Sequence, residues 1–543
     1  MDNILVVIPA RGGSKGIPRK NLRMLGGKPL IQYSIMTALA SRYKPDVYVS
    51  TEDDEIALIS KKVGASIIER ELDKASDNTT LDPVIYDCMI KAEAIEGKDY
   101  QLVVTLQPTS PLIRTESLDA ALGKMLENER LDTILSVVND THLTWRYENS
   151  RYTPNYRERV NRQYLTPTYK ETGGFLIARK RSITENTRIG GCVELFELQG
   201  GEAVDIDSHE DWSLCEYYRK REKILFVVSG YQEIGLGHVY NSLIIANDIL
   251  DHQVEFLVDR KSQLAFEKIS SKNYPVYIQE SDDLIRDIER LRPNVVINDK
   301  LDTQPGEIRE LKRKGMKVIN FEDLGEGAKF ADLVINAIYP ERQVLPDHYF
   351  GHDYVVLRDE FILTPPKPVQ NVVSNVLLTF GGVDPDNLTK KVLKAIHQYC
   401  QSNGIGISVV TGFGYRYHSS LDEFDNVRVF RNTSSISDHM INADIAFTSA
   451  GRTTYEIASL EVPCIVLAQN ERELSHLFAS AEFGFLNLGH GKKVGAETIL
   501  DIFIQLVENP ASRKYMASLM SKADLASGRK RVRKLIRNVL ETS

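Results

Sequence analysis

The sequence predicts an α/β protein built around parallel sheets. Short apolar runs rich in β-branched residues alternate with helical patterns along the whole chain. Continuous apolar runs of this length are typical of strands in parallel sheets that helices cover on both faces. Three of the runs lead directly into loops that contain glycine. The expected strands are ILVVIPA, DVYVST, LVVTLQ and TILSVV in the first part, then KILFVVS, VEFLVD, NVVIND, KVINF and NVLLTFGG.

Domain organisation follows from length and from two shifts in composition. A chain of 543 residues is too long for one core, so several domains are expected. The charged segment EYYRKREK marks a first boundary and the proline-rich segment LTPPKPVQNVVS marks a second. The basic amphipathic stretch at the end, GRKRVRKLIRNVLETS, is expected to be a helix on the last domain. The predicted domains are residues 1–220, 223–366 and 372–543, the last two being Rossmann-like halves.

The bulk composition excludes several classes of protein. A net charge of -8 argues against a general nucleic-acid binder. Five scattered cysteines without a CxxC pair argue against a disulfide framework or a structural zinc site, and they fit a reducing cytoplasm. No apolar run approaches the length of a membrane span and the start lacks a signal-peptide pattern, so we expect a cytoplasmic protein with no membrane contact.

The first candidate site is the loop IPARGGSKGIPRKN, residues 8–21, behind the first strand. It lacks the Gly-Lys-Ser/Thr of a Walker A loop. Its glycines let backbone N–H groups approach a polyanion, and Arg11 and Lys20 can contact phosphate oxygens. A solvated basic turn would also explain this stretch taken alone.

Four further polar segments stand at the ends of expected strands. Within AVDIDSHEDW, alternate residues of a strand would send Asp205 and Asp207 to one face. Two hard oxygen ligands plus substrate phosphates suit Mg²⁺, although a solvated strand end also explains an isolated Asp-x-Asp. The other segments are STEDDEIA, RELDKASDNTT and LQPTSPLIR.

In this order and spacing, the segments of residues 1–220 resemble the CMP-sialic acid synthetases, a family of cytidylyltransferases. The resemblance implies attack by the anomeric hydroxyl of a nonulosonic acid on the α-phosphorus of CTP, with Mg²⁺ on Asp205 and Asp207, and a homodimer. Catalysis would depend on alignment and charge neutralisation. The implied triphosphate contacts are Arg11, Gly12, Gly13, Ser14, Lys15 and Lys20, and the implied cytidine contacts are Asn21, Arg70, Thr80 and Gln107.

The choice of acid stays open at this point. Glu71 and the stretch from Glu171 to Gly174 differ from the family pattern. Sialic, legionaminic and pseudaminic acids are the candidates, and a Kdo-type acid is the alternative, although GGSKGIPRKN resembles the sialic-type loop better.

The second candidate site begins at GYQEIGLGHVYNSLIIANDIL, behind the strand ILFVVS. Gly235 and Gly237 permit a tight turn into a helix, and His238 stands at the helix N-terminus, a position that favours a neutral imidazole base. A capping or packing role would also explain an isolated histidine. The expected buried face of the helix carries Val239, Leu243 and Ala246.

Together with four later segments, this region resembles the GT-B-fold UDP-sugar hydrolase of pseudaminic acid biosynthesis and, more distantly, MurG-type glycosyltransferases. The segments are NVVINDKLDT, YVVLRDEF, LLTFGGVDPDNLT and TSAGRTTYEIASLEVPCIVLAQNERELSH. The resemblance implies UDP between two halves and a water that His238 deprotonates, with no metal. The implied contacts are Gly381, Gly382, Gly451, Arg452, Thr453 and Thr454 at the diphosphate, Glu456 at the ribose, and Asn470 and Glu471 towards the sugar.

Three hypotheses for this region stay open. The leading hypothesis is a bifunctional enzyme with a cytidylyltransferase and a UDP-sugar hydrolase. The second is a UDP-dependent glycosyltransferase. The third is a non-catalytic module that binds a UDP-sugar, because Asn241 stands where the hydrolase pattern has arginine and no His-Tyr pair is found near Asp299.

Overall fold

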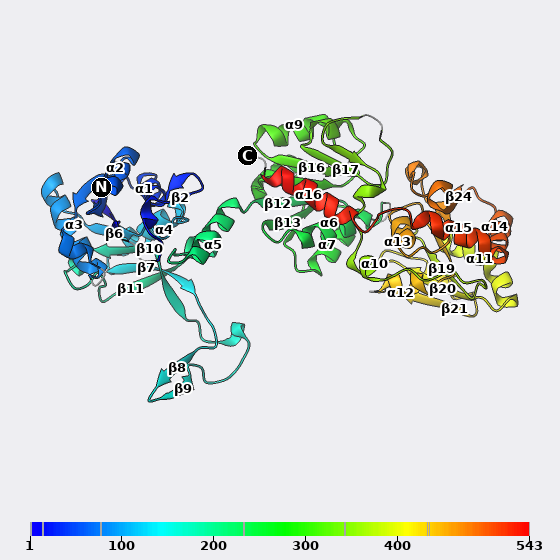
Figure 1. Ribbon diagram of the computed structural model, residues 1–543, viewed down its shortest axis with the longest axis horizontal. Coiled ribbons are helices and arrows are strands. Elements are labelled where there is room, and N and C mark those ends of the chain that lie inside the picture. The colour runs from blue at the N-terminus through cyan, green and yellow to red at the C-terminus, as the bar shows by residue number, and fades with distance from the viewer. Residues whose placement is uncertain are drawn as a thin grey trace. The chain divides into compact units, whose positions relative to one another are not determined.

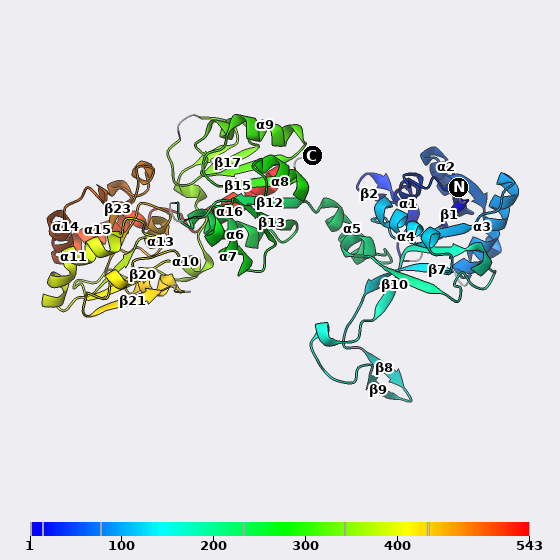
Figure 2. The same ribbon diagram turned by 180° about the vertical axis from the view of Figure 1, so that it is seen from behind.

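The computed structural model describes residues 3–13, 16–76, 79–231, 234–341, 344–431, 433 and 435–541. Two of the expected triphosphate contacts, Ser14 and Lys15, lie outside the described residues. The chain divides into two compact units, Met1–Arg221 and Glu222–Ser543, which are described separately (Figures 1 and 2). The α/β prediction is confirmed, since each unit is built from sheets covered by helices.

The first unit contains a seven-stranded sheet in the order β11-β7-β10-β6-β1-β4-β5. Four strands of this sheet, β6, β1, β4 and β5, run parallel as expected. The expectation of a purely parallel sheet is wrong at β10, which runs antiparallel to β6 and β7. The arm that connects β7 to β10 contains no α-helix of the kind that usually joins parallel strands. The strands are β1 (Ile4–Pro9), β4 (Asp46–Thr51), β5 (Ser66–Glu69), β6 (Leu102–Leu106), β7 (Thr133–Asn139), β10 (Tyr169–Arg179) and β11 (Val193–Glu197).

Helices cover both faces of this sheet. The apolar side chains of α1, α2 and α4 join one core with Val6 and Ile8, whereas α3 packs on the opposite face against Leu5 and Val7. This alternation along β1 explains why its sequence is apolar throughout. The helices are α1 (Leu30–Leu39), α2 (Asp54–Val63), α3 (Leu81–Glu96), α4 (Thr115–Glu127) and α5 (His209–Lys220).

The arm between β7 and β10 carries a two-stranded hairpin of its own. Strands β8 (Trp145–Glu148) and β9 (Arg151–Pro154) pair antiparallel, away from the main sheet of the unit (Figure 1). The hairpin exposes three large aromatic side chains, those of Trp145, Tyr147 and Tyr152.

The second unit contains two parallel sheets, and the first has the order β14-β13-β12-β15-β16-β17-β18. Its faces are covered by α6 and α7 on one side and by α8 and α9 on the other (Figures 1 and 2). The strands are β12 (Lys223–Val228), β13 (Gln253–Val258), β14 (Val276–Ile278), β15 (Val295–Asp299), β16 (Lys317–Phe321), β17 (Leu333–Asn336) and β18 (His348–Phe350). The helices are α6 (Gly237–Asp248), α7 (Gln263–Ser270), α8 (Leu284–Leu291) and α9 (Pro305–Arg313).

The second parallel sheet of this unit has the order β21-β20-β19-β22-β23-β24. In both sheets the strand order reverses beside the first strand, and ligands of such sheets bind in the crevice at the carboxyl ends of the strands. The strands are β19 (Asn375–Thr379), β20 (Gly406–Thr411), β21 (Val427–Arg431), β22 (Ile445–Thr448), β23 (Cys464–Ala468) and β24 (Phe485–His490). The helices are α10 (Asp359–Leu363), α11 (Leu388–Ser402), α12 (Ile436–Ile441), α13 (Thr453–Ser459), α14 (Ala496–Glu508) and α15 (Pro510–Met520).

The last helix, α16 (Gly528–Glu541), differs from its expected place. It was expected on the 372–543 half, but Val532 and Ile536 are buried in the core of the first half, and Figure 1 shows α16 lying over that half. Arg529 donates two hydrogen bonds of 2.7 Å to the carboxylate of Asp248 at the end of α6. The apolar stripe of α16 therefore covers part of the first sheet, and the second half ends before this helix.

Two predictions from composition can be compared with the structure. All five cysteines are free. Within the described residues, no helix has both the length and the apolar character needed to cross a bilayer.

Candidate functional sites

The first site lies at the edge of the first unit's sheet where the parallel strands end. The loops after β1, β4, β5 and β6 all leave this edge. Ala10 N donates to Ser50 O and Arg70 N donates to Thr51 O, both at 3.0 Å, so the loops are tied together. The Arg70 guanidinium is buried and donates to Ser50 O at 2.7 Å.

The glycine-containing loop is held by a carboxylate that the sequence did not single out. Gly12 N donates to Glu52 Oε1 at 2.7 Å, and Asn21 Nδ2 donates to Arg11 O at 3.0 Å. Burial lowers the pKa of Arg70, and the charge of Glu52 opposes this shift. Glu52 is the first acidic residue after β4, which is the sequence signal that could have indicated it.

The same loop contacts the Asp-Ile-Asp segment far along the chain. Lys20, only 9% exposed, donates from Nζ to Ile206 O, and Nζ lies 3.3 Å from Asp207 Oδ1. A Cβ on Gly16 would lie 2.3 Å from Asp207 O, so only glycine fits at this approach. The structure thus brings together the two segments that the sequence assigned to one site.

The secondary structure expected for this segment is wrong. Asp205, Ile206 and Asp207 form no strand; they lie in the connection between the short helix η5 (Gly200–Ala203) and α5, where Asp207 stands at a bend. The reason is that Ile206 is fully buried among core residues of the unit, which fixes the segment without a strand partner. Asp205 and Asp207 precede and follow this buried isoleucine in the chain, and a shared face for their two carboxylates stays a prediction.

The two aspartates have different environments. Asp205 Oδ1 is buried and has no hydrogen-bond partner among the described residues, whereas the Asp207 side chain is 81% exposed. Burial raises the pKa of Asp205; the charge of Asp207 adds to the shift and that of Lys20 opposes it. A Cβ on Gly173 would lie 2.8 Å from Asp205 Oδ1, so glycine at this position makes room for the carboxylate.

No group of three or more His, Cys, Asp or Glu side chains suited to a metal occurs in the described part of the chain. The other predicted contacts lie in loops at the same edge. Gln107 follows β6 and its carbonyl accepts from Ser34 Oγ at 3.2 Å, Thr80 precedes α3, and Gly13 follows β1.

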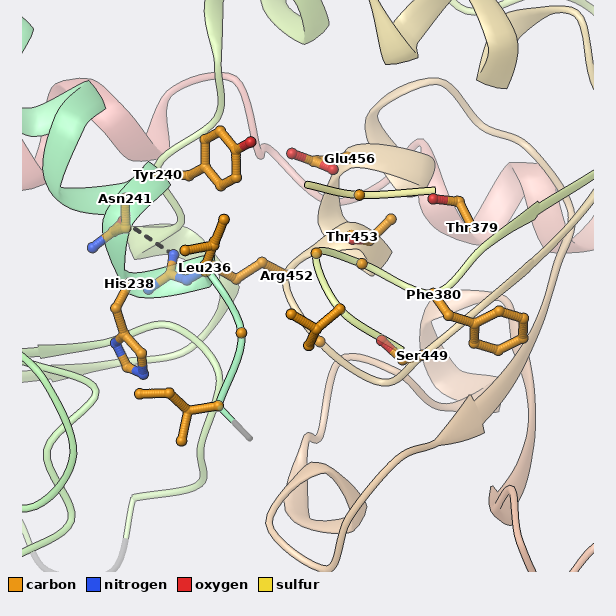
Figure 3. Close-up of a pocket in the computed structure, with 18 of the residues that line it drawn as sticks. Leu236, His238, Tyr240, Asn241, Thr379, Phe380, Ser449, Arg452, Thr453 and Glu456 are labelled. Atoms are coloured by element: carbon orange, nitrogen blue, oxygen red, sulfur yellow. Dashed lines mark hydrogen bonds between the residues drawn. The ribbon is translucent and has the colours of Figure 1, made fainter. Parts of the chain in front are cut away.

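The second site is a cleft of ≈ 590 Å³ between the two sheets of the second unit (Figure 3). Thr454 does not line it, because this side chain is fully buried and bonds Gly451 O at 2.8 Å. Glu471 does not line it either, since it is exposed and lies 3.3 Å from Lys493 Nζ. The predicted residues that do line the cleft are Gly235, Gly237, His238, Gly381, Gly382, Gly451, Arg452, Thr453, Glu456 and Asn470.

His238 is paired with a buried carboxylate. Its Nδ1 lies 2.7 Å from Oδ1 of Asp299, which ends β15 and is fully buried. The other oxygen, Oδ2, accepts from Asn241 Nδ2 at 2.6 Å and from Ser242 Oγ at 2.9 Å. Positions 238, 241 and 242 share one face of α6. Hydrogen bonding to a carboxylate favours the proton on Nδ1 and leaves Nε2 as an acceptor.

Arg452 reaches from the second half to the first. Its Nη1 donates to Asn241 Oδ1 at 3.0 Å, a bond drawn in Figure 3, and its Nη2 donates to Glu322 Oε1 at 2.9 Å. Glu322 follows β16 and is only 1% exposed. Burial raises the pKa of Glu322; Arg452 opposes this shift and Asp299 adds to it.

Two partly buried carboxylates line the cleft from the second half. Glu456 accepts from Arg358 Nε at 3.1 Å and Nη2 at 2.8 Å, and burial raises its pKa while Arg358 opposes the shift. Glu473 Oε2 accepts from the backbone N–H groups of Ala450 at 3.2 Å and Gln469 at 2.8 Å. Burial raises the pKa of Glu473 to about 7.

The chain is similar to known proteins over its first part and, in one case, over nearly its whole length. The cytidylyltransferase family model matches residues 5–183. CMP-N,N'-diacetyllegionaminic acid synthase of Legionella pneumophila is 32% identical over 225 residues, which cover 39% of this chain and 94% of that protein. N-acylneuraminate cytidylyltransferase A of Danio rerio is 31% identical over 224 residues, 39% of this chain, and the chain spans only 50% of its length.

One relative matches both units. This protein of Helicobacter pylori, described as pseudaminic acid cytidylyltransferase and UDP-2,4-diacetamido-2,4,6-trideoxy-beta-L-altropyranose hydrolase, is 23% identical over 542 residues. The alignment covers 94% of this chain and 96% of that protein.

Proposed function

Since the chain belongs to the cytidylyltransferase family, we propose that its first unit transfers CMP from CTP to a nonulosonic acid. The oxygen of the anomeric hydroxyl forms a bond to the α-phosphorus, the bond from this phosphorus to the bridging oxygen breaks, and pyrophosphate leaves. The observation that carries the proposal is the contact of Lys20 with Ile206 O and Asp207, which joins the glycine-containing loop to the acidic segment. A cation and carboxylates that lie together in this way suit a triphosphate with a bound metal ion, because the cation can contact phosphate oxygens and the carboxylates can bind the metal.

Asp205 and Asp207 would hold the Mg²⁺ ion. The residues fit such an ion, because Asp205 Oδ1 is buried without a partner among the described residues and both side chains offer hard oxygen atoms. With only two carboxylates, the remaining ligands would come from phosphate and water. Bound Mg²⁺ would neutralise charge on the triphosphate. Lys20 and Arg70 bind and orient the nucleotide as fixed cations, and Gly12 N–H can donate to a phosphate oxygen in place of Glu52.

The acid substrate would be sialic, legionaminic or pseudaminic acid. Relatives named for N-acylneuraminate, N,N'-diacetyllegionaminic acid and pseudaminic acid are all similar to this chain. A homodimer through the first unit also belongs to the proposal, and the exposed aromatic side chains of the β8–β9 hairpin are suited to a protein contact. A cytoplasmic location stays a prediction from the composition.

For the second unit we propose hydrolysis of a UDP-linked amino sugar without a metal. Nε2 of His238 takes a proton from water, the water oxygen bonds to the anomeric carbon, and the bond from that carbon to the UDP oxygen breaks. The buried carboxylate of Asp299 holds the imidazole and stabilises its protonated form. The loops at Gly381 and Gly451 would receive the diphosphate, with Glu456 at the ribose.

Each activity is tested by its own assay on the full chain. With CTP, Mg²⁺ and each acid in turn, the protein should release pyrophosphate, and no turnover with any acid would contradict the first proposal. With a UDP-linked amino sugar in water enriched in ¹⁸O, the label should enter the free sugar and not UDP. His238→Gln should abolish this release.

The same assay decides between the alternatives for the second unit. UDP release that requires an added acceptor sugar would indicate a glycosyltransferase. UDP binding without any release would indicate a binding module.

A further inference from the structure

We infer that Asn241 is a positioning residue that couples Arg452, on the second half of the unit, to the His238–Asp299 pair on the first half. The inference rests on the proposed hydrolase function and adds a residue that acts through others. Asn241 is only 2% exposed, and both ends of its amide are used.

The amide of Asn241 bridges two groups of opposite charge. Nδ2 donates to Asp299 Oδ2 at 2.6 Å, and Oδ1 accepts from Arg452 Nη1 at 3.0 Å. An asparagine offers donors at one end and an acceptor at the other, which neither aspartate nor leucine does. Asn241 and the Ser242 hydroxyl both donate to Oδ2 of Asp299, while Oδ1 bonds His238.

Charge explains why Arg452 enters the first half at all. Asp299 and Glu322 are buried carboxylates that end or follow the neighbouring parallel strands β15 and β16. Two buried anions at one sheet edge are costly without a cation. Arg452 bonds Glu322 Oε1 directly at 2.9 Å and reaches Asp299 through Asn241. Its position therefore depends on both halves being in contact.

Asn241 also suits this arrangement better than a cation would. An arginine at position 241 would pair with Asp299 itself and would repel Arg452. A neutral amide leaves the role of the cation to Arg452, which lines the cleft. An arginine has five N–H donors, so its two bonds to the first half are compatible with a further bond to a phosphate oxygen. The His238–Asp299 pair is then oriented only when the two halves meet around a nucleotide.

Two substitutions separate these roles. Asn241→Leu removes both bonds at similar volume. Asn241→Asp keeps the acceptor for Arg452 but places a carboxylate against Asp299. Asn247→Asp is the matched control, because Asn247 lies on the same helix, is exposed, and keeps its acceptor for the Tyr274 hydroxyl.

The first measurement uses UDP alone as the probe and does not require turnover. In wild type and in Asn247→Asp, UDP should slow hydrogen exchange of the α6 amides by about fivefold or more. Asn241→Leu should show less than about twofold slowing, and Asn241→Asp should keep the effect. Absence of UDP-dependent protection in wild type, or equal protection in Asn241→Leu, would overturn the inference.

The second measurement is UDP release from a UDP-linked amino sugar. Asn241→Asp should lower kcat by about tenfold or more with KM within about twofold, whereas Asn241→Leu should change both. A kcat within twofold of wild type for both variants would overturn the inference. If wild type itself releases no UDP from any such sugar, the proposed hydrolase fails, and the exchange measurement alone decides whether Asn241 couples the halves.

Discussion

Glu473 provides a prediction whose size follows from the structure. Burial raises the pKa of this carboxyl from 4.5 to about 7; the backbone N–H groups of Gln469 and Ala450 oppose the shift, and Asp384 adds to it. Glu473→Gln removes the ionisable group and keeps an oxygen that can accept from both N–H groups. The variant therefore isolates the effect of the charge.

The sign follows from proton binding. Between pH 4.5 and about 7 the folded protein binds the proton that the unfolded chain has lost, so this residue lowers stability progressively as the pH rises. A pKa shift of this size lowers the free energy of unfolding by about 3 kcal/mol at pH 8 and by about 1 kcal/mol at pH 5. The free energy of unfolding of Glu473→Gln, relative to wild type, should therefore be about 2 kcal/mol higher at pH 8 than at pH 5.

Thermal unfolding of the full chain measures this difference. The transition of the second unit is identified by its upward shift when UDP is added. Its midpoint in Glu473→Gln should rise relative to wild type by about 4 °C more at pH 8 than at pH 5. Glu497→Gln, at an exposed position of the same unit, should show no such difference. Equal shifts for Glu473→Gln at both pH values would contradict a raised pKa of Glu473 in the folded protein.

Three further predictions concern the two sites. Asp299→Asn should lower kcat for UDP release by about 10³- to 10⁴-fold with KM nearly unchanged, because an amide no longer favours the proton on Nδ1 of His238; steady-state kinetics checks this. Asp205→Asn should abolish pyrophosphate release and yet raise the unfolding temperature of the ligand-free protein at pH 8. Burial raises the pKa of Asp205, so the charged carboxylate lowers stability above that pKa. An unchanged or lower unfolding temperature would contradict this prediction. Gly173→Ala should lower pyrophosphate release by about tenfold or more by displacing the Asp205 carboxylate, while Gly191→Ala, whose added Cβ would meet its nearest atom at 3.9 Å, should not.

The strands were predictable because burial on both faces leaves a continuous apolar run. Two predicted segments, DVYVST and KVINF, coincide with β4 and β16. Strand β10 was missed as a strand because its first half is polar and contains Gly173 and Gly174. The amphipathic pattern of α16 was correct, but such a pattern shows which face of a helix is apolar and not which surface that face will cover.

Site residues could be predicted from the sequence where they stand in a loop that follows a strand. They could not be predicted where their role depends on a partner far along the chain. Lys20 and Asp207 were both assigned to the first site, and they lie in contact. Asp299, Glu322 and Glu473 were missed as site residues. Each is an ordinary acidic residue in the sequence, and its role arises from burial and from partners far along the chain.

The most direct test of the account uses two variants in one mixture that contains CTP, Mg²⁺, a nonulosonic acid and a UDP-linked amino sugar. Pyrophosphate and UDP are measured together for wild type, Asp207→Asn and His238→Gln. Wild type should release both products, Asp207→Asn should lose only pyrophosphate release, and His238→Gln should lose only UDP release. A variant that loses both activities or neither would contradict the assignment of one reaction to each unit.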